Sequence, residues 1–196
     1  LRASLTWHSS IDIDMRTTEA FPASQGDPKL TGSGITGPAA TTGTTDVTLP
    51  ETFKLAVQSG IAKNTLLFGS VRYADWQEFS LIPPVLQRDL ATLDSAITYE
   101  IGIGRRFTER LSGRISYTLD DSDGDDLVSP LAPTDGSQAI SIGAKYKLTD
   151  TIDISGGIRY TLLGDARPEI GTPDTPLADF DDNDAISAGL TLGVHF

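Results

Sequence analysis

The last twelve residues of the chain constrain its fold most. Residues 185–196 read Ala-Ile-Ser-Ala-Gly-Leu-Thr-Leu-Gly-Val-His-Phe, so apolar side chains alternate with small or polar ones. A period of two residues is typical of a β-strand with one apolar and one polar face. The same alternation recurs through most of the preceding chain, interrupted in turn by short turns and long polar loops. This rhythm predicts an all-β fold, a transmembrane antiparallel up-and-down β-barrel.

Composition narrows the classes of function. The 196 residues are 38% hydrophobic, and no apolar run approaches the roughly 20 residues that a membrane-spanning helix needs. The formal net charge of −12 argues against a nucleic-acid partner, because nucleic-acid-binding surfaces are basic. Cysteine is absent, which excludes disulfides, thiol catalysis and thiolate metal sites. The sequence opens at Leu1 inside an alternating run, with neither a starting Met nor a signal segment, as expected if an upstream part has been removed or is not included.

The alternation predicts eight strands in a single domain, residues 1–196. These strands cover residues 1–17, 46–59, 65–79, 96–106, 111–120, 137–148, 151–163 and 185–196. Long loops are predicted at residues 19–45, 80–95, 121–136 and 164–184, which are rich in Pro, Gly, Ser, Thr and Asp. Long and short connections alternate without exception, as expected for a barrel that is inserted from one side.

Tyrosines on the apolar faces give a second argument for a membrane barrel. Tyrosine is favoured where the ring lies in lipid and the hydroxyl reaches the headgroups. Four of them are expected at one height near the long-loop edge of the apolar band: Tyr73, Tyr99, Tyr117 and Tyr160. The opposite edge is expected at Tyr146, Phe107 and Phe196. Together these side chains predict an aromatic girdle.

Two short runs carry a resemblance to a known family. They are Leu49-Pro50-Glu51-Thr52-Phe53-Lys54-Leu55, at a strand entry, and Tyr73-Ala74-Asp75-Trp76-Gln77-Glu78-Phe79, at a strand exit. With the terminal Phe196, the chain resembles the C-terminal half of the FadL family of outer-membrane long-chain fatty-acid transporters. The resemblance implies the last eight strands of a fourteen-stranded barrel, without the N-terminal hatch and the first strands. It implies passive uptake of a hydrophobic small molecule across a Gram-negative outer membrane.

Candidate ligand contacts follow from the resemblance and from the polar faces. The loop at residues 19–45 corresponds to one that helps form an external hydrophobic groove in the family, and its apolar residues are Phe21, Leu30 and Ile35. Phe68 and Trp76 are candidates for apolar contacts inside the barrel. The polar faces place Arg72, Glu100, Arg114, Lys145 and Arg159 inside. Two interpretations of these charges stay open: a track for a ligand headgroup, and a ladder of cross-strand charge pairs.

The residues give little support for catalysis or for metal binding. His8 and His195 have no carboxylate at metal-ligand spacing and no serine in a nucleophile elbow. The acidic run at residues 120–126 suggests calcium, but an EF-hand loop starting at Asp121 would need glycine where Asp126 stands and glutamate where Ala132 stands. Neither a metal site nor a cofactor is predicted, and an enzyme such as an outer-membrane lipase is the weakest alternative. The acidic loops are candidates for a divalent-ion bridge to lipopolysaccharide.

The closing strand leaves one architectural alternative open. In a small, closed eight-stranded barrel with a structural or adhesive role, residues 185–196 would pair with the strand that begins at Leu1. In the family architecture they would pair with a strand outside this sequence. The terminal Phe196 also resembles the C-terminal signal that the barrel-assembly machinery reads, although Thr191 stands where that signal usually has glycine.

Overall fold

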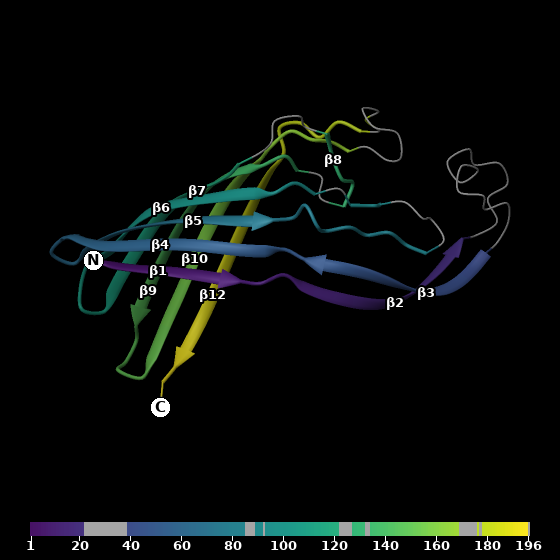
Figure 1. The fold of residues 1–196 in the computed structure, drawn as a ribbon. Coiled ribbons are helices and arrows are strands. Elements are labelled where there is room, and N and C mark those ends of the chain that lie inside the picture. The colour runs from purple at the N-terminus through teal and green to yellow at the C-terminus, as the bar shows by residue number, and fades with distance from the viewer. Residues whose placement is uncertain are drawn as a thin grey trace.

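One curved antiparallel sheet dominates the structure (Figure 1). The computed structural model describes residues 1–21, 39–84, 89–91, 93–121, 127–131, 134–168, 176 and 178–195. The sheet has eight strands in the order β1-β4-β5-β6-β7-β9-β10-β12. Their bounds are β1 Arg2–His8, β4 Glu51–Ala62, β5 Thr65–Asp75, β6 Ala96–Arg106, β7 Leu111–Asp120, β9 Ser137–Lys147, β10 Ile152–Leu163 and β12 Asp184–Val194. Each pairs antiparallel with its neighbour, which confirms the predicted all-β, up-and-down fold.

A hairpin between β1 and β4 in the chain extends beyond the eight-stranded sheet. It consists of β2 (Ile11–Phe21) and β3 (Ala39–Leu49), which pair with each other and project away from the eight strands (Figure 1). The prediction of single strands at residues 1–17 and 46–59 was therefore wrong, since each is divided in two. Pro50 separates β3 from β4, because proline cannot donate a ladder hydrogen bond.

The predicted loop at residues 19–45 was also too long. β2 and β3 extend into it from both ends, and threonine hydroxyls meet across this hairpin. Those of Thr17 and Thr45 are 3.2 Å apart, and those of Thr18 and Thr42 are 3.3 Å apart. Threonine is β-branched and favours strands, so a Thr-rich segment can pair without apolar alternation.

Short turns join the strands at one end of the sheet. They lie between β4 and β5, between β6 and β7, and between β9 and β10, as predicted. Asn64 in the first turn has a φ of 61°, in the left-handed region that asparagine tolerates. The third predicted strand, residues 65–79, ends earlier than expected, at Asp75.

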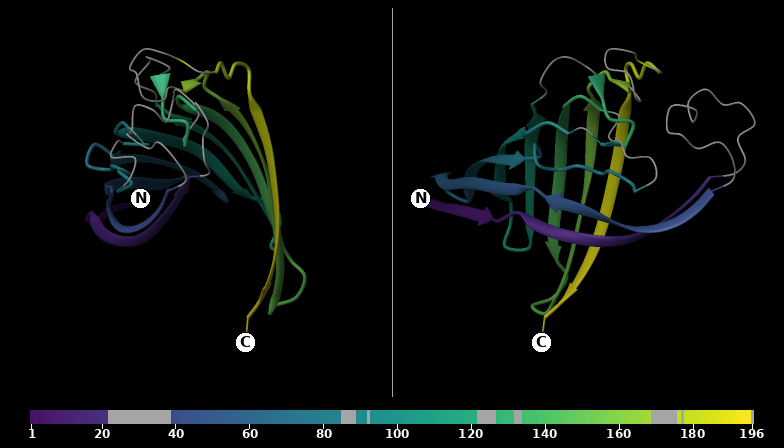
Figure 2. Two further views of the ribbon diagram at one scale, coloured as in Figure 1. Left: turned by 90° about the vertical axis from the view of Figure 1, so that its right-hand side faces the viewer. Right: turned by 45° about the vertical axis from the view of Figure 1, so that its right-hand side comes forward.

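The long loops at the other end contain structure that the sequence did not predict. β8 (Leu127–Val128) and β11 (Arg167–Pro168) belong to different loops and pair in parallel. The hydroxyl of Ser129 donates to the carbonyl of Leu90, 3.1 Å away, and so joins a third loop to them. Ser129, Ala91 and Ala166 are buried here. The short β8–β11 pair thus lies at the end of the sheet opposite the short turns (Figure 2).

The apolar side chains lie on one face of the sheet. Cross-strand register builds continuous rows, such as Leu67–Ile103–Ile115–Ile142–Ile158 and Val57–Gly69–Ile101–Tyr117–Ile140–Tyr160–Ile186. These are the outward faces predicted from the alternation. Among the described residues no large side chain is fully buried, and the buried apolar residues are Val47 and four alanines. The outer face therefore needs apolar surroundings, since exposed apolar area costs about 25 cal/mol per Å² in water.

No helix in the described part of the chain has the length and apolar character to cross a membrane.

Four tyrosines of the outer face occupy three neighbouring register rows. Tyr73 shares a register row with Trp7 and Phe53, and the rings of Trp7 and Phe53 stack at 6.5 Å. Tyr99 lies one outer-face row nearer the short turns, and Tyr117 and Tyr160 share the row after that. Strands of membrane barrels tilt by roughly 35–45°, so residues of equal height fall on different rows. The shift of one row per strand runs from β5 to β7 but does not continue to β10, since Tyr160 shares the row of Tyr117, and a single girdle stays a prediction. Tyr146 lies near the short turns on the same face, and Phe196 lies outside the described residues.

The sheet does not close on itself. β1 pairs with β4 and β12 pairs with β10, and within the described strands neither has a second neighbour. The alternative of a closed eight-stranded barrel, in which β12 pairs with β1, is not what the structure shows.

Candidate functional site: a basic inner wall

The concave face of the sheet carries most of its basic side chains. Register places eight of them inside: Arg2, Lys54, Arg72, Arg106, Arg114, Lys145, Lys147 and Arg159. Three acidic side chains accompany them on the eight strands: Glu100, Asp120 and Asp153. Eight positive and three negative charges give this wall a net charge of +5, in a chain whose net charge is −12. The inner wall thus attracts anions although the protein as a whole is acidic.

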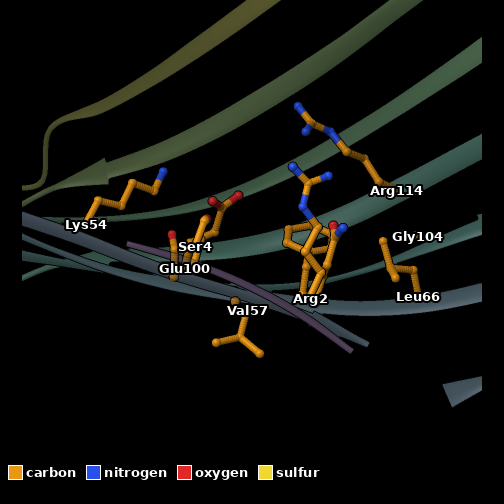
Figure 3. A pocket seen from close by; sticks show the side chains of 13 residues that line it. Arg2, Ser4, Lys54, Val57, Leu66, Glu100, Gly104 and Arg114 are labelled. Atoms are coloured by element: carbon orange, nitrogen blue, oxygen red, sulfur yellow. The ribbon is translucent and has the colours of Figure 1, made fainter. Parts of the chain in front are cut away.

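A cavity of about 450 Å³ lies on this wall where β1, β4, β5, β6 and β7 meet. Its charged lining residues are Arg2, Lys54, Glu100 and Arg114, and Leu66 and Phe68 supply its larger inward apolar side chains. Lys54, Arg2 and Arg114 point to the same side of the sheet, whereas Val57 points to the other (Figure 3). The cavity therefore combines apolar surface with an excess of positive charge.

The cations of the cavity have no carboxylate partner in the described part of the chain. The ion pairs found there join Asp153 to Lys145 and to His195, at the short-turn end of the wall. Lys54 lies in direct register with Arg72, and like charges opposite each other on a sheet destabilise it. An anion bound between the two strands would offset that repulsion. The wall around the cavity is thus suited to an anionic group rather than to internal charge pairing.

The residues predicted as ligand contacts fall into three groups. Phe68 and Arg114 line the cavity, and Arg72 lies beside it through its register with Lys54. Arg159 is on the same wall but outside the cavity, where its Nε donates to the hydroxyl of Thr161 at 3.3 Å. Trp76 follows the end of β5 and does not line the cavity; its ring meets Phe79 edge-on at 5.5 Å.

The candidates for the external groove come from the loop predicted at residues 19–45. Leu30 and Ile35 lie outside the described residues, and of Phe21 only the strand backbone is described. Their role as ligand contacts stays a prediction.

Sequence reasoning missed Arg2, Lys54 and Leu66 as members of the site. The alternation alone places Arg2 on a polar face with Ser4 and Thr6, but it does not say which strand lies beside it. Only the register, Arg2 opposite Gln58 and Gln58 opposite Phe68, brings Arg2 to the cavity.

A separate cluster of charged side chains holds the end of β12 at the short-turn end of the sheet. The Asp153 carboxylate accepts from Lys145 Nζ at 2.9 Å and lies 2.7 Å from His195 Nε2, so it joins β9 and β10 to the residue that follows β12. Gly193 opposite Asp153 leaves room for this carboxylate, whose Oδ1 would be 2.9 Å from a Cβ at that position. Within the described residues no three His, Asp or Glu side chains are grouped as metal ligands.

Replacing Asp153 by alanine is expected to loosen β12, because Lys145 and His195 lose their shared partner. The purified protein should unfold at a lower Tm, measured by the heat-dependent gel mobility of folded barrels. Asp150→Ala, in the adjacent short turn, is the matched control and should leave the Tm unchanged. Equal Tm values for the two variants would contradict a role of the cluster in holding β12.

Comparison with known proteins supports the architecture. No protein-family model and no curated protein matches the sequence. Among solved structures, a Pseudomonas aeruginosa FadL homologue matches 97% of the chain at 12% identity and a TM-score of 0.67. The Pseudomonas putida toluene transporter TodX matches 99% at 13% identity and a TM-score of 0.55, and a TodX mutant described as a monoaromatic hydrocarbon channel matches 97% at a TM-score of 0.58. The chain spans 44–46% of these proteins, less than half of their length. The chain therefore has the fold of a C-terminal portion of the β-barrels of these FadL and TodX proteins.

Proposed function

We propose that this chain contributes to an outer-membrane barrel of a Gram-negative cell that takes up hydrophobic compounds, foremost long-chain fatty acids, by passive diffusion. The observation that carries this proposal is the inner-wall cavity. There, Phe68 and Leu66 lie beside three cations that have no carboxylate partner in the described chain. A fatty acid joins the same two features in one molecule, an apolar body and a single negative charge.

The cavity suggests how each part of such a molecule is bound. The carboxylate is placed near Arg2 and Arg114, whose guanidinium groups can donate two parallel hydrogen bonds to it. The hydrocarbon chain then lies on Phe68 and Leu66, away from water. Glu100 in the same lining keeps the net charge of the cavity at +2, so that an anion is attracted without being held too tightly to leave. No cofactor is needed, since the concentration gradient and the partitioning of the apolar body drive passage.

Two further observations support this function. The exposed apolar rows of the outer face match a membrane environment, in which lipid surrounds the sheet. The solved structures with the same fold include a protein described as a toluene transporter. Neutral hydrocarbons are therefore the main competing ligand class, and the charge of the inner wall favours the carboxylate.

Uptake by whole cells tests the proposed function. Cells that lack the gene are compared with cells that carry the full-length protein, and entry of radiolabelled oleate is measured. The deletion strain is expected to take up oleate more slowly, and the gene should restore the rate. Equal uptake by the two strains would reject the proposal.

Charge reversal at Arg114 tests the proposed headgroup contact. Arg114→Glu is expected to weaken palmitate binding to the purified protein by roughly 10-fold or more, since the loss of about 1.4 kcal/mol changes an equilibrium tenfold. Binding of hexadecanol, which has the same chain without the charge, should change little. Arg110→Glu, which makes the same change in the short turn between β6 and β7, is the control. If both variants weakened both ligands alike, the carboxylate contact would be excluded.

A further inference from the structure

Among the described residues that line the cavity, Phe68 is the only aromatic one, and its ring lies over a glycine of the next strand. In register, Phe68 of β5 is opposite Gly102 of β6. The ring atom Cζ lies too close to the position that a Cβ of Gly102 would take for both to fit, so a side chain there would displace the ring. The same position is 2.7 Å from the Cβ of Ser116 on β7. The ring therefore packs across β6 in the direction of β7 and does not project straight out from the inner face.

The strand beneath the ring shows the effect of this arrangement. Ser116 lies on the inner face of an open trough, yet only 5% of it is exposed. Its hydroxyl has no hydrogen-bond partner in the described part of the chain, and an unpartnered buried hydroxyl costs about 1–3 kcal/mol. This region is thus filled by an aromatic ring although the polar wall gains no hydrogen bond from it. A polar side chain at position 68 could form a hydrogen bond with the Ser116 hydroxyl, which the ring cannot, so packing alone does not explain the ring.

The Phe68 ring lies close enough in register to the cations of the cavity to contact a ligand that they bind. Phe68 shares a register row with Gln58 and Arg2, and the neighbouring row toward the short turns contains Gly104 and Arg114. A carboxylate held by Arg2 and Arg114 would place the first carbons of its ligand against this ring. The ring also occupies the space above Gly102 and Ser116, into which a wider ligand body would have to extend.

We propose that Phe68, seated on Gly102, selects ligands by the width of their apolar body and admits narrow unbranched chains in preference to broad, fused-ring carboxylates. This inference rests on the proposed function, because it assigns a specificity to the same cavity. The face of the Phe68 ring is a flat apolar surface on which a single hydrocarbon chain can pack. A fused-ring body with the same carboxylate needs the volume that the Phe68 ring fills.

Removal of the ring tests this specificity. Binding of palmitate and of cholate, a carboxylate with a broad fused-ring body, is measured with the purified full-length protein in detergent. The wild-type protein is expected to prefer palmitate. Phe68→Ala should bind palmitate roughly 10-fold more weakly, since about 1.4 kcal/mol of apolar contact is lost, and it should bind cholate more strongly, so that the preference falls by more than tenfold.

A neighbouring residue supplies the matched control. Leu67→Ala makes a similar truncation on the lipid-facing side of the same strand and should leave the preference unchanged. Phe68→Leu keeps an apolar side chain and is expected to shift the preference in the same direction by less, which provides a test if Phe68→Ala does not fold. An unchanged ratio of the two affinities in a folded Phe68 variant would overturn the inference. Failure of the wild-type protein to bind palmitate at all would instead overturn the proposed function.

Discussion

Replacing Leu190 by arginine is expected to impair membrane insertion severely. Leu190 lies near the middle of β12 on the outer face, with 77% of it exposed. A lipid-facing arginine near the centre of the bilayer costs roughly 2–4 kcal/mol. The loss is concentrated on the closing strand, where β12 has only β10 as a described neighbour to hold it. The measurement is the fraction of protein that reaches the outer membrane with the gel mobility of a folded barrel.

The adjacent residue is the matched control. Thr191 lies on the inner face, opposite Ser155 and in the same row as Lys145. An arginine there remains in water on a wall that already carries basic side chains. Thr191→Arg should therefore insert nearly as well as the wild-type protein. If Thr191→Arg failed and Leu190→Arg inserted normally, the two faces of the sheet would have been assigned the wrong way round.

The strands and their faces were predictable because the sequence encodes them locally. In a one-layer sheet with lipid on one side and water on the other, every second residue meets a different solvent. Ile152, Ile154, Ile158, Tyr160 and Leu162 display this contrast within a single strand, without reference to any other part of the chain. The same reasoning identified the short turns, which separate two clearly alternating segments.

The β2–β3 extension could not be predicted in this way. Residues 39–45 read Ala-Ala-Thr-Thr-Gly-Thr-Thr and contain no apolar alternation. Their strand conformation depends on pairing with β2, including contacts between threonine hydroxyls across the hairpin. The β8–β11 pair is hidden for a related reason: two residues from each of two loops meet only after the strands have brought the loops together.

The candidate site was predictable only in part. Arg72, Arg114 and Phe68 stand out because they interrupt small, polar positions on inward faces. Arg2 and Lys54 are equally inward, but their place beside Arg114 depends on the register of four successive strand pairs. Trp76 was expected inside the barrel because it continues the parity of β5, but the strand ends one residue earlier. The tilt of the Phe68 ring over Gly102 is a tertiary contact that no sequence pattern contains.

Substitution of Gly102 by valine is expected to destabilise the sheet between β6 and β7. A Cβ at this position would lie 2.7 Å from the backbone carbonyl oxygen of Ile115 and would clash with Cζ of the Phe68 ring. The ring can rotate away, but the carbonyl belongs to the neighbouring strand, so the strands themselves must separate. Overpacking of this kind, including the backbone shifts that it forces, costs about 1–3 kcal/mol.

Gly189 provides a control of the same chemistry, because it also faces inward from the middle of a strand and has nothing within 4 Å of its potential Cβ. Gly189→Val should change the free energy of unfolding by no more than about 0.5 kcal/mol, since the β-branched side chain favours a strand. Urea unfolding in detergent, followed by the fluorescence of Trp7 and Trp76, gives both values. Equal destabilisation by the two valines would show that loss of glycine at an inward position, and not the close approach of Ile115 and Phe68, determines the cost.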